Sequence, residues 1–403
     1  MKSNYKKLGD FIQQVKKRNN DNILTVDNLR GINISKEFMP SVANVTGTDL
    51  SVYKVVEKNQ FAYNPMHVGR DEVLPISMLV NEDKVIVSPA YVIFEIVDTD
   101  KLLSEYLMIW CRRREFDRNA WFTTDSSVRG GFNWEDFCDL EVPVPTLEKQ
   151  KEIIKEYHTI TDRIKLNEQL NKKLEDTAQS IYKEWFVNFE FPDENGKPYK
   201  SNGGEMVYCE ELEIEIPKGW QISYLSKIAT YLNGLAMQKY ECEKEEYLPV
   251  LKIKELNQGY TDINSGKVTL DIPKDYIVLD GDVIFSWSAS LKVDIWSGGT
   301  CGLNQHLFKV TSNQYEKWFY YLATKYHLSE FIRIAEGNKT SMGHIKREHL
   351  DNAVVFIPNN KHFKKINKLI KPLVENIILN KKEKFELMKF QEILLSKIAT
   401  IEG

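Results

Sequence analysis

The sequence predicts a mixed α/β protein in which two similar modules are separated by two long antiparallel helices, with a pseudo-two-fold relation between the halves. Residues 127–185 and 340–398 follow one pattern at a constant separation, as Pro145 and Pro358 illustrate (358 − 145 = 213). Each copy ends in a long heptad-spaced stretch, which is typical of helices that pair with one another. A self-similarity this long indicates a repeated architecture.

The repeat continues upstream with a different spacing. Residues 53–61 match residues 276–284 at a separation of 223, and residues 91–94 match residues 305–308 at a separation of 214. The first module therefore carries about nine or ten extra residues, most simply as a longer loop around residues 66–82. Because loops carry binding residues on a common scaffold, the two modules are expected to recognise different targets.

Length and composition agree with a folded protein of several domains. At 403 residues with 42% hydrophobic residues, two or three domains are expected. The predicted order is a first module, a first long helix, an acidic linker, a second module and a second long helix, at residues 1–146, 147–190, 191–217, 218–358 and 359–403.

The sequence lacks the signals of secretion and of membrane insertion. It begins without an apolar signal stretch, and its apolar runs fall short of the ~18 residues that a membrane span needs. The five cysteines are scattered and show no CxxC spacing, which argues against a disulfide framework and a zinc site. A cytoplasmic, thiol-reduced protein without a bound metal is expected.

Charge is placed unevenly along the chain. The net charge is −4, but residues 191–217 hold seven acidic residues against two lysines, a net of 2 − 7 = −5. The remainder is therefore close to neutral, at −4 + 5 = +1. Global charge neither supports nor excludes the basic footprint that nucleic-acid binding needs.

Each module is expected to combine short helices with an irregular sheet. The predicted opening helices lie at residues 8–17 and 225–232, and the later helices at 102–116 and 315–334. The predicted strands lie at residues 23–26, 52–56, 84–87 and 91–96 in the first module and at 248–253, 268–270, 282–286 and 305–310 in the second.

The two long helices are expected to pack against each other over roughly 60 Å each. Their heptad seams are interrupted by Asn167 and Asn380 near the midpoints, which predicts that these two asparagines face each other and fix the register. The alternative is that both lie at the edge of the seam and are hydrated. The residues expected to form the helix pair are Ile160, Ile164, Asn167, Leu174, Leu373, Ile377, Asn380 and Leu387.

Pro372 departs from the repeat, since the first copy has Thr159 at that position. A proline inside a helix removes a hydrogen bond and clashes with the preceding turn. The second long helix is therefore predicted to bend or to begin near residue 371.

Two polar loops are candidates for gripping phosphates. Residues 123–131 and 336–344 combine hydroxyls, glycines and a cation, which can position a module on a duplex without reading bases. The alternative is a solvated turn that joins a helix to a strand. The candidate contacts in these loops are Ser126, Ser127, Arg129, Lys339, Thr340, Ser341 and His344.

Other side chains have the donors and acceptors that base recognition requires. Arginine pairs with guanine, and glutamine or asparagine with adenine, in the major groove. The candidates are His67, Arg70, Lys252, Lys254, Lys292 and Gln305, each of which could equally be a surface residue without a DNA contact. We find no P-loop, GxGxxG, HExxH or GxSxG motif, which favours a non-catalytic role.

Several motifs together resemble the specificity subunit of type I restriction-modification systems. They are Tyr63-Asn-Pro, Ser88-Pro-Ala-Tyr, Leu279-Asp-Gly-Asp-Val-Ile-Phe-Ser-Trp-Ser, Leu303-Asn-Gln-His-Leu-Phe-Lys, Trp185-Phe-Val-Asn-Phe and Glu213-Ile-Glu-Ile-Pro-Lys-Gly-Trp. The resemblance covers almost the whole chain. The first module departs from the second at Glu57-Lys58-Asn59, where the second has Asp-Gly-Asp, so different targets are expected.

The resemblance implies two target-recognition domains that each read half of a split DNA sequence, with the helices setting the spacer. It also implies docking of two modification subunits, which bind S-adenosylmethionine and methylate adenine, and of restriction subunits that use ATP and Mg. This chain itself would bind no cofactor. A methyltransferase–nuclease fusion is disfavoured because two modules leave no room for a catalytic domain. A coiled-coil scaffold without sequence-specific DNA binding remains the alternative.

Overall fold

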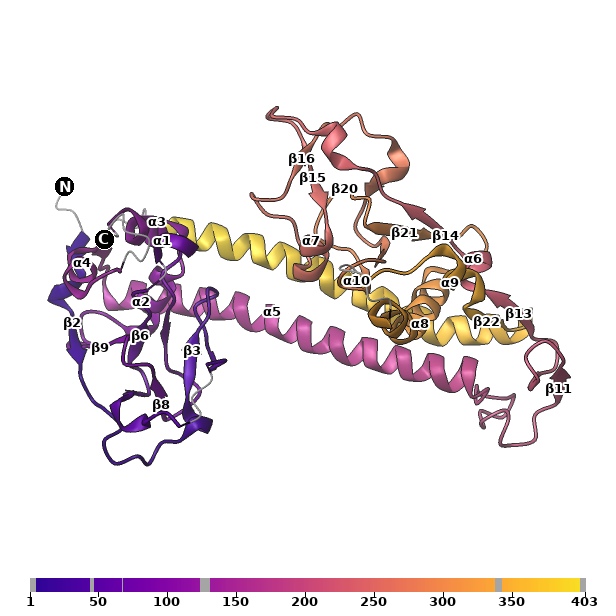
Figure 1. Cartoon of the computed structure of the whole chain (residues 1–403), viewed down its shortest axis with the longest axis horizontal. Helices are drawn as coiled ribbons and strands as arrows, with labels where there is room; N and C mark the ends of the chain where they lie inside the picture. The colour runs from indigo at the N-terminus through magenta and orange to yellow at the C-terminus, as the bar shows by residue number, and fades with distance from the viewer. Residues whose placement is uncertain (1–4, 44–46, 67, 124–130, 338–342, 399–403) are drawn as a thin grey trace. The chain divides into compact units, whose positions relative to one another are not determined.

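The computed structural model describes the chain except for residues 1–4, 44–46, 67, 124–130, 338–342 and 399–403. The chain divides into two compact units (Figure 1). The first unit comprises residues 1–162 and 388–403, and the second comprises residues 163–387. Both mix helices with sheets, so the predicted fold class is confirmed.

The main sheet of each unit has four antiparallel strands in the same order. In the first unit the order is β2-β9-β6-β7, with bounds Ile12–Val15, Val92–Ile96, Phe61–Tyr63 and Ile76–Met78. In the second unit the order is β14-β21-β18-β19, with bounds Thr230–Asn233, Leu307–Thr311, Val283–Ser286 and Lys292–Ile295. The repeat seen in the sequence is therefore a repeat of topology.

The 213-residue offset reappears in the helices that follow each sheet. Helix α4 (Trp134–Asp139) and helix α9 (Arg347–Asn352) begin 213 residues apart, as do α5 at Leu147 and α10 at Asn360. Strand β1 (Tyr5–Lys7) pairs with β10 (Glu141–Pro143), and β13 (Gln221–Tyr224) pairs with β22 (Val354–Ile357).

Smaller sheets complete the units. The first unit contains the pairs β3·β4 and β5·β8, with bounds Arg30–Ile32, Phe38–Pro40, Lys54–Glu57 and Lys84–Val87. The second contains the sheet β16-β15-β20-β17, with bounds Lys267–Val268, Leu248–Leu251, Cys301–Leu303 and Ile277–Val278. A hairpin of β11 (Met206–Cys209) and β12 (Ile214–Pro217) lies in the predicted acidic linker.

The predicted opening helices are wrong beyond their first turn. Residues 8–10 form a 3-10 turn and α6 covers only Leu225–Ile228, after which each chain segment becomes the strand β2 or β14. The cause is tertiary, because these strands form the antiparallel edge of the main sheet. Sequence propensity for a short apolar run does not distinguish the two states.

Two other predicted elements differ. Residues 23–26 do not form a strand, because Thr25 and Asn28 form a capping box around a 3-10 turn (Val26–Asn28). The predicted helix at 102–116 is two helices, α2 (Ser104–Cys111) and α3 (Arg114–Thr123). The other predicted strands form within a few residues of their expected bounds, and the helix predicted at 315–334 is α8 (Lys317–Gly337).

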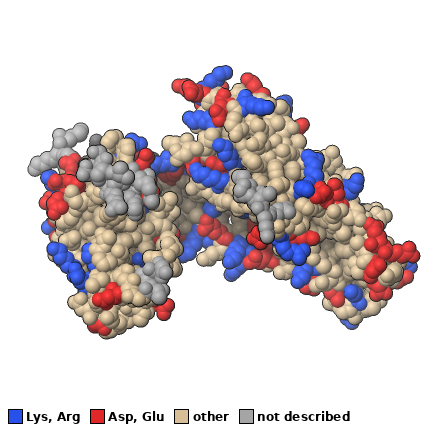
Figure 2. Space-filling model, in the orientation of Figure 1, with Lys and Arg blue, Asp and Glu red and all other residues tan. Residues whose placement is uncertain are grey.

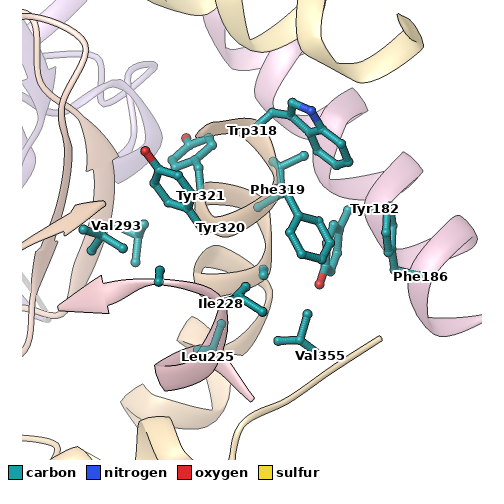
Figure 3. Close-up of a cluster of buried hydrophobic side chains, with 14 of the residues drawn as sticks. Tyr182, Phe186, Leu225, Ile228, Val293, Trp318, Phe319, Tyr320, Tyr321 and Val355 are labelled. Atoms are coloured by element: carbon teal, nitrogen blue, oxygen red, sulfur yellow. The ribbon is translucent and has the colours of Figure 1, made fainter. Parts of the chain in front are cut away.

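The core of the second unit is built around α8. Trp318, Phe319 and Tyr321 of this helix are 1% exposed or less. Figure 3 shows Phe319 beside Tyr182 at the end of α5, and Trp318 and Phe319 pack against Phe186 in the following π-helical turn (Lys183–Val187). Rings of this size bury a large apolar area, so they fix α8 against the helix pair.

Helix α5 (Leu147–Tyr182) and helix α10 (Asn360–Lys397) pack antiparallel within the second unit. Arg163 Nε and Nη2 donate to the two carboxylate oxygens of Glu383 at 2.8 and 2.9 Å. About two turns after Arg163 on α5, Asn171 accepts a hydrogen bond from Asn380, which precedes Glu383 on α10. Since position numbers rise on one helix as they fall on the other, the two chains run in opposite directions.

The predicted Asn167–Asn380 pair is not formed. Asn167 is 1% exposed and its Nδ2 donates to Glu383 Oε2 at 3.0 Å, while Asn380 Nδ2 donates to Asn171 Oδ1 at 3.1 Å. The register is therefore displaced by about one helical turn, because Arg163 holds Glu383 in the position opposite Asn167. Asn167 is also not hydrated at an edge, which excludes the alternative expectation for this residue.

The apolar positions expected in the pair are placed as follows. Ile377 is fully buried, whereas Ile160, Ile164, Leu174, Leu373 and Leu387 are half-buried. In the first unit, Tyr157 of α5 accepts a hydrogen bond from Gln391 of α10 at 3.1 Å, so the two helices also meet there.

Pro372 does not start the second long helix, which runs without interruption from Asn360 to Lys397. Ile370, Val374 and Ile377 on either side of it are 2% exposed or less. Burial of this face stabilises the helix across the missing hydrogen bond, and Pro372 itself is exposed.

A chain of alternating charges joins the helix pair to the sheet of the second unit. Lys325 of α8 pairs with Glu175 of α5 at 2.6 Å, and Glu175 lies 3.4 Å from Lys381 of α10. Lys381 also pairs with Asp294 of β19, which Lys292 contacts at 3.1 Å. Burial acts to raise the pKa of Asp294, but Lys381 and Lys292 outweigh it and hold the pKa below its usual value.

We predict that Asp294→Asn lowers the free energy of unfolding by about 3 kcal/mol at pH 7, because Lys381 loses a partner where both side chains are less than one-fifth exposed. Urea denaturation measures this change. The depressed pKa means that the ionised Asp294 stabilises the folded state above pH ~3.9, the unfolded value. The difference between wild type and variant should therefore shrink as the pH falls below about 4.

The exposed Asp275→Asn is the matched control, and it should leave the free energy of unfolding unchanged. Equal stability of Asp294→Asn and wild type at pH 7 would contradict the prediction.

Candidate nucleic-acid interface

In the second unit, one end of the main sheet holds the segment that precedes α9. Ala289 N donates to Gly343 O at 2.9 Å, and Ile345 N donates to Trp287 O at 3.1 Å. Ser288 forms an isolated antiparallel bridge with His344. These backbone contacts fix the C-terminal end of the predicted polar loop 336–344 beside the end of β18.

Polar and aromatic side chains gather at this point. Trp287 Nε1 donates to Asn233 Oδ1 at 2.9 Å, and Ser288 Oγ lies 3.2 Å from His306 Nδ1. The amide nitrogen of Gln305 lies 3.5 Å from His306 Nε2. The tautomer of His306 decides which atom donates in each of these two contacts.

Gln305 is half-buried beside His306. If its amide donates one hydrogen to His306, its carbonyl oxygen and second hydrogen are left without a partner among the described residues. An amide with one free donor and one free acceptor matches the edge that adenine presents in the major groove. The group Asn233, Trp287, Ser288, Gln305 and His306 is hereafter called the polar cluster.

Gly234 allows the polar cluster to form. A Cβ atom at this position would lie 2.2 Å from Asn304 O, which is closer than atoms can approach. Gly234 N also donates to Leu307 O at 3.0 Å, so strand β14 reaches β21 directly beside Gln305. Any larger residue would displace Asn233 from Trp287.

The first unit has a similar anchoring contact. Phe132 N donates to Pro65 O at 3.0 Å. Residue 132 corresponds in the repeat to Ile345 (345 − 132 = 213), and Pro65 lies one residue after the counterpart of Trp287 (287 − 223 = 64). The polar loop predicted at 123–131 therefore also returns to the end of the third sheet strand, here β6. In both units the residue that follows the predicted polar loop is thus anchored near the end of the same strand of the main sheet.

The connection that follows this strand differs between the units. It covers residues 64–75 between β6 and β7 and includes a short helix, α1 (Val68–Asp71), but only residues 287–291 between β18 and β19. The predicted longer loop in the first module is therefore located at the edge of the sheet where the polar loop returns. Length differences at this edge alter what each unit can contact.

The structure brings two of the sequence-predicted site residues together. Gln305 and His344 lie together at the end of the sheet, and the ring of His344 is edge-on to Trp287 at 6.4 Å. Arg70 belongs to α1, with its side chain outside the described part of the structure. The other loop candidates lie outside the described residues: His67, Ser126, Ser127, Arg129, Lys339, Thr340 and Ser341.

Three predicted lysines lie elsewhere, around helix α7 (Ile253–Gln258). Lys252 is exposed at the start of the helix, and Lys254 is exposed 3.5 Å from Asp262. Lys292 donates to Leu256 O at 2.9 Å and contacts Asp294, so it stabilises the end of α7 within the unit. The polar cluster does not include these lysines.

Sequence reasoning missed four members of the polar cluster: Asn233, Trp287, Ser288 and His306. The usable signal was the polar and aromatic run Ser286-Trp-Ser-Ala-Ser directly after a strand of buried residues, with His306 next to a predicted contact. Asn233 carried no signal, because its contact with Trp287 joins residues 54 positions apart.

Sequence reasoning also missed a basic group in the first unit. Lys16, Arg18 and Lys54 lie close together where β2 ends, and Arg18 bridges to Lys54. Burial lowers the pKa of Lys54, and Arg18 and Lys16 lower it further by repulsion. Adjacent cations of this kind favour an anionic partner such as a phosphate.

Two further kinds of site were sought in the described part of the chain. No group of three or more His, Cys, Asp or Glu residues in it could hold a metal ion. None of its helices is long and apolar enough to cross a membrane.

Comparisons with known proteins agree with this picture. The type I restriction modification DNA specificity domain matches residues 74–176 and 217–389. The MjaIX specificity subunit of Methanocaldococcus jannaschii is 28% identical over 313 residues, which cover 75% of this chain and 70% of that protein. The HindI specificity subunit of Haemophilus influenzae is 20% identical, with 89% of each chain covered.

A solved structure shows the same fold. The type I restriction-modification S subunit of M. genitalium aligns with 98% of this chain and 95% of its own, at a TM-score of 0.52 and 14% identity. The relatives are named as specificity subunits of restriction enzymes, in agreement with the specificity role without catalysis expected from the sequence. The chain belongs to the family of type I restriction-modification DNA specificity subunits.

Proposed function

We propose that this specificity subunit reads a DNA site in two halves, one with each unit. The observation that carries the proposal is that both units have the same strand order and a similar backbone anchor after the predicted polar loop, with connections of different length beside it. Equivalent scaffolds with unlike loops would contact two similar stretches of duplex and read different bases. The contacts proposed for the second unit are the polar cluster, His344 and the loop residues 339–341.

We further propose that α5 and α10 set the spacer between the half-sites. Helices of 36 and 38 residues are long for a small domain, and their register is fixed by buried groups such as Asn167 rather than by apolar contacts alone. A helix pair with a unique register holds a constant length. This is the property that a fixed spacer requires.

The helices also carry the proposed docking surfaces for two modification subunits. Leu166 of α5 and Leu379 of α10, which correspond in the repeat (379 − 166 = 213), are 51% and 61% exposed. Leu170 and Leu369 are 42% and 49% exposed. Leu166 and Leu170 lie one turn apart on α5, and such an exposed apolar pair is a surface that a partner could cover.

In the proposed complex the cofactors belong to other subunits. S-adenosylmethionine would bind to the modification subunits and ATP with Mg to the restriction subunits, while this chain would bind double-stranded DNA and no cofactor. The complex would act in the cytoplasm, on the DNA of the cell.

We predict that Gln305→Ala changes specificity at one base pair, costing about 1–3 kcal/mol of discrimination there, because the free amide edge is lost. Lys339→Ala should instead weaken binding to all sequences alike and lower the salt dependence by about one phosphate contact. Binding of the assembled methyltransferase to a library of duplexes at several salt concentrations measures both. The exposed Gln314→Ala is the control and should change neither.

Binding that is absent at low salt for the wild-type assembly would favour the alternative, a coiled-coil scaffold without DNA recognition.

Replacing residues 218–358 with the corresponding domain of another specificity subunit should change one half of the methylated sequence and leave the other half and the spacer intact. The reason is that the main sheet, polar cluster and loop of the second unit all lie within this range. Sequencing that detects methylated adenines in a host genome gives the answer. A change in both halves would contradict independent reading.

Inserting one heptad into both α5 and α10 should lengthen the spacer by about three base pairs, since seven residues add about 10 Å to a helix. The same methylation mapping measures the spacer. A heptad inserted in the exposed segment after Lys244 serves as the control and should leave it unchanged. An unaltered spacer after the helix insertions would refute the role of the helices.

A further inference from the structure

The second unit contains a hollow at the start of α10 that the reading of DNA does not use. Its volume is about 560 Å³, within the range of sites that bind small molecules or anchoring side chains. It lies between the beginning of α10 and the segment that follows α5. The lining residues are Pro192, Asp193, Glu194, Tyr199, Lys361, His362, Lys364, Lys365 and Lys368.

One wall of the hollow is a fixed group of rings. Phe191 stacks on Tyr199 with ring centres 4.5 Å apart and packs against His362 at 4.7 Å. Trp220 Nε1 donates to His362 Nδ1 at 3.0 Å. Burial lowers the pKa of His362, and Lys361 and Lys365 lower it further, so the ring stays neutral and Nδ1 accepts. The wall is therefore uncharged and held in one position.

The other wall is a row of four lysines on one face of α10. Lys361 pairs with Glu194, and Lys365 donates to the backbone oxygens of Pro192, at 3.1 Å, and Asp193. Within the described residues, Lys364 and Lys368 have no hydrogen-bond or ion-pair partner, and both are exposed. With Asp193 and Glu194 included, the lining carries a net charge of 4 − 2 = +2.

The corresponding part of the first long helix is different. By the 213-residue offset, Lys361 and Lys365 replace Glu148 and Glu152 of α5. Helix α10 has no acidic residue in its first turn, although the helix dipole favours negative charge there. Repulsion between the lysines therefore destabilises the start of α10, whereas α5 has glutamates at two of these positions. A bound anion would relieve this repulsion.

We propose that this hollow receives an acidic segment of a modification subunit, with one apolar or aromatic side chain inserted against Tyr199 and His362 and two carboxylates on Lys364 and Lys368. This inference rests on the proposed docking of modification subunits and locates one of their contacts. The neutral ring wall matches the apolar side chain, and the net charge of +2 matches the two carboxylates.

A protein segment fits the surroundings better than duplex DNA. The β11–β12 hairpin adjoins the hollow, since Tyr199 donates to Glu205 O at 3.0 Å. The hairpin and its flanks expose Glu205, Glu210, Glu211, Glu213 and Glu215. Figure 2 shows acidic side chains gathered at the right end of the view, where Figure 1 labels β11. A duplex carries one charge per ~1.7 Å and would be repelled along this hairpin, whereas a short segment reaches only the lysines.

The test is the double variant Lys364→Glu/Lys368→Glu in the full chain, mixed with purified modification subunits. Native mass spectrometry gives the number of subunits bound, and titration gives their affinity. We expect the variant to lose one modification subunit or to bind it about tenfold or more weakly, most clearly at low salt. Thermal stability should be equal to that of the wild type or slightly higher, because both lysines are exposed and unpaired in the described structure and the change removes repulsion at the start of α10.

The matched control is Lys151→Glu/Lys155→Glu, at the equivalent positions of α5, which should bind as wild type does. Equal losses in both variants would overturn the proposal, since the effect would then belong to the helix charge and not to the hollow. Normal assembly with weaker, less salt-dependent DNA binding would also overturn it and assign the lysines to phosphates. Failure of the wild-type chain to bind any modification subunit would instead reject the proposed function itself.

Discussion

The contact between Lys381 and Asp294 is the constraint on which the second unit depends. It links helix α10 to strand β19, and through Glu175 and Lys325 it includes α5 and α8 as well. Charges that are mostly removed from water must be paired, so only one register of the helices satisfies all of them. This register also fixes the position of the polar cluster. Asp294 lies on β19, β19 pairs with β18, and the cluster lies at the end of β18.

Much of the architecture was predictable because repetition is visible in the sequence. The predicted start of the first long helix at residue 147 is that of α5, and the predicted start of the second at residue 359 is one residue before that of α10. The asparagine contacts were not predictable, since periodicity identifies the buried face but not the register between two helices. Which residue lies opposite Asn167 depends on Arg163 holding Glu383, an interaction of side chains 220 positions apart. The prediction of the opening helices was wrong for a similar reason, because these segments form strands by pairing with a partner that is distant in the sequence.

The candidate site was predictable only in part. Gln305 and His344 stand out as polar residues beside a strand and a glycine-rich loop, and they do lie together. Trp287 and His306 belonged to motifs that carried the family resemblance, yet nothing in their spacing indicated a shared position. Lysine is a residue type that often contacts DNA, but Lys292 donates to Leu256 O and forms an ion pair with Asp294. The sequence does not show which lysines and arginines already have partners within the protein, and only those without partners are available to bind DNA.

The anchors of the two polar loops are made entirely by main-chain atoms, from Phe132 N to Pro65 O and from Ile345 N to Trp287 O. Peptide groups are the same for nearly every amino acid, so mutation of the neighbouring side chains leaves these anchors in place. New sequence preferences could thus arise through successive substitutions without an unfolded intermediate variant.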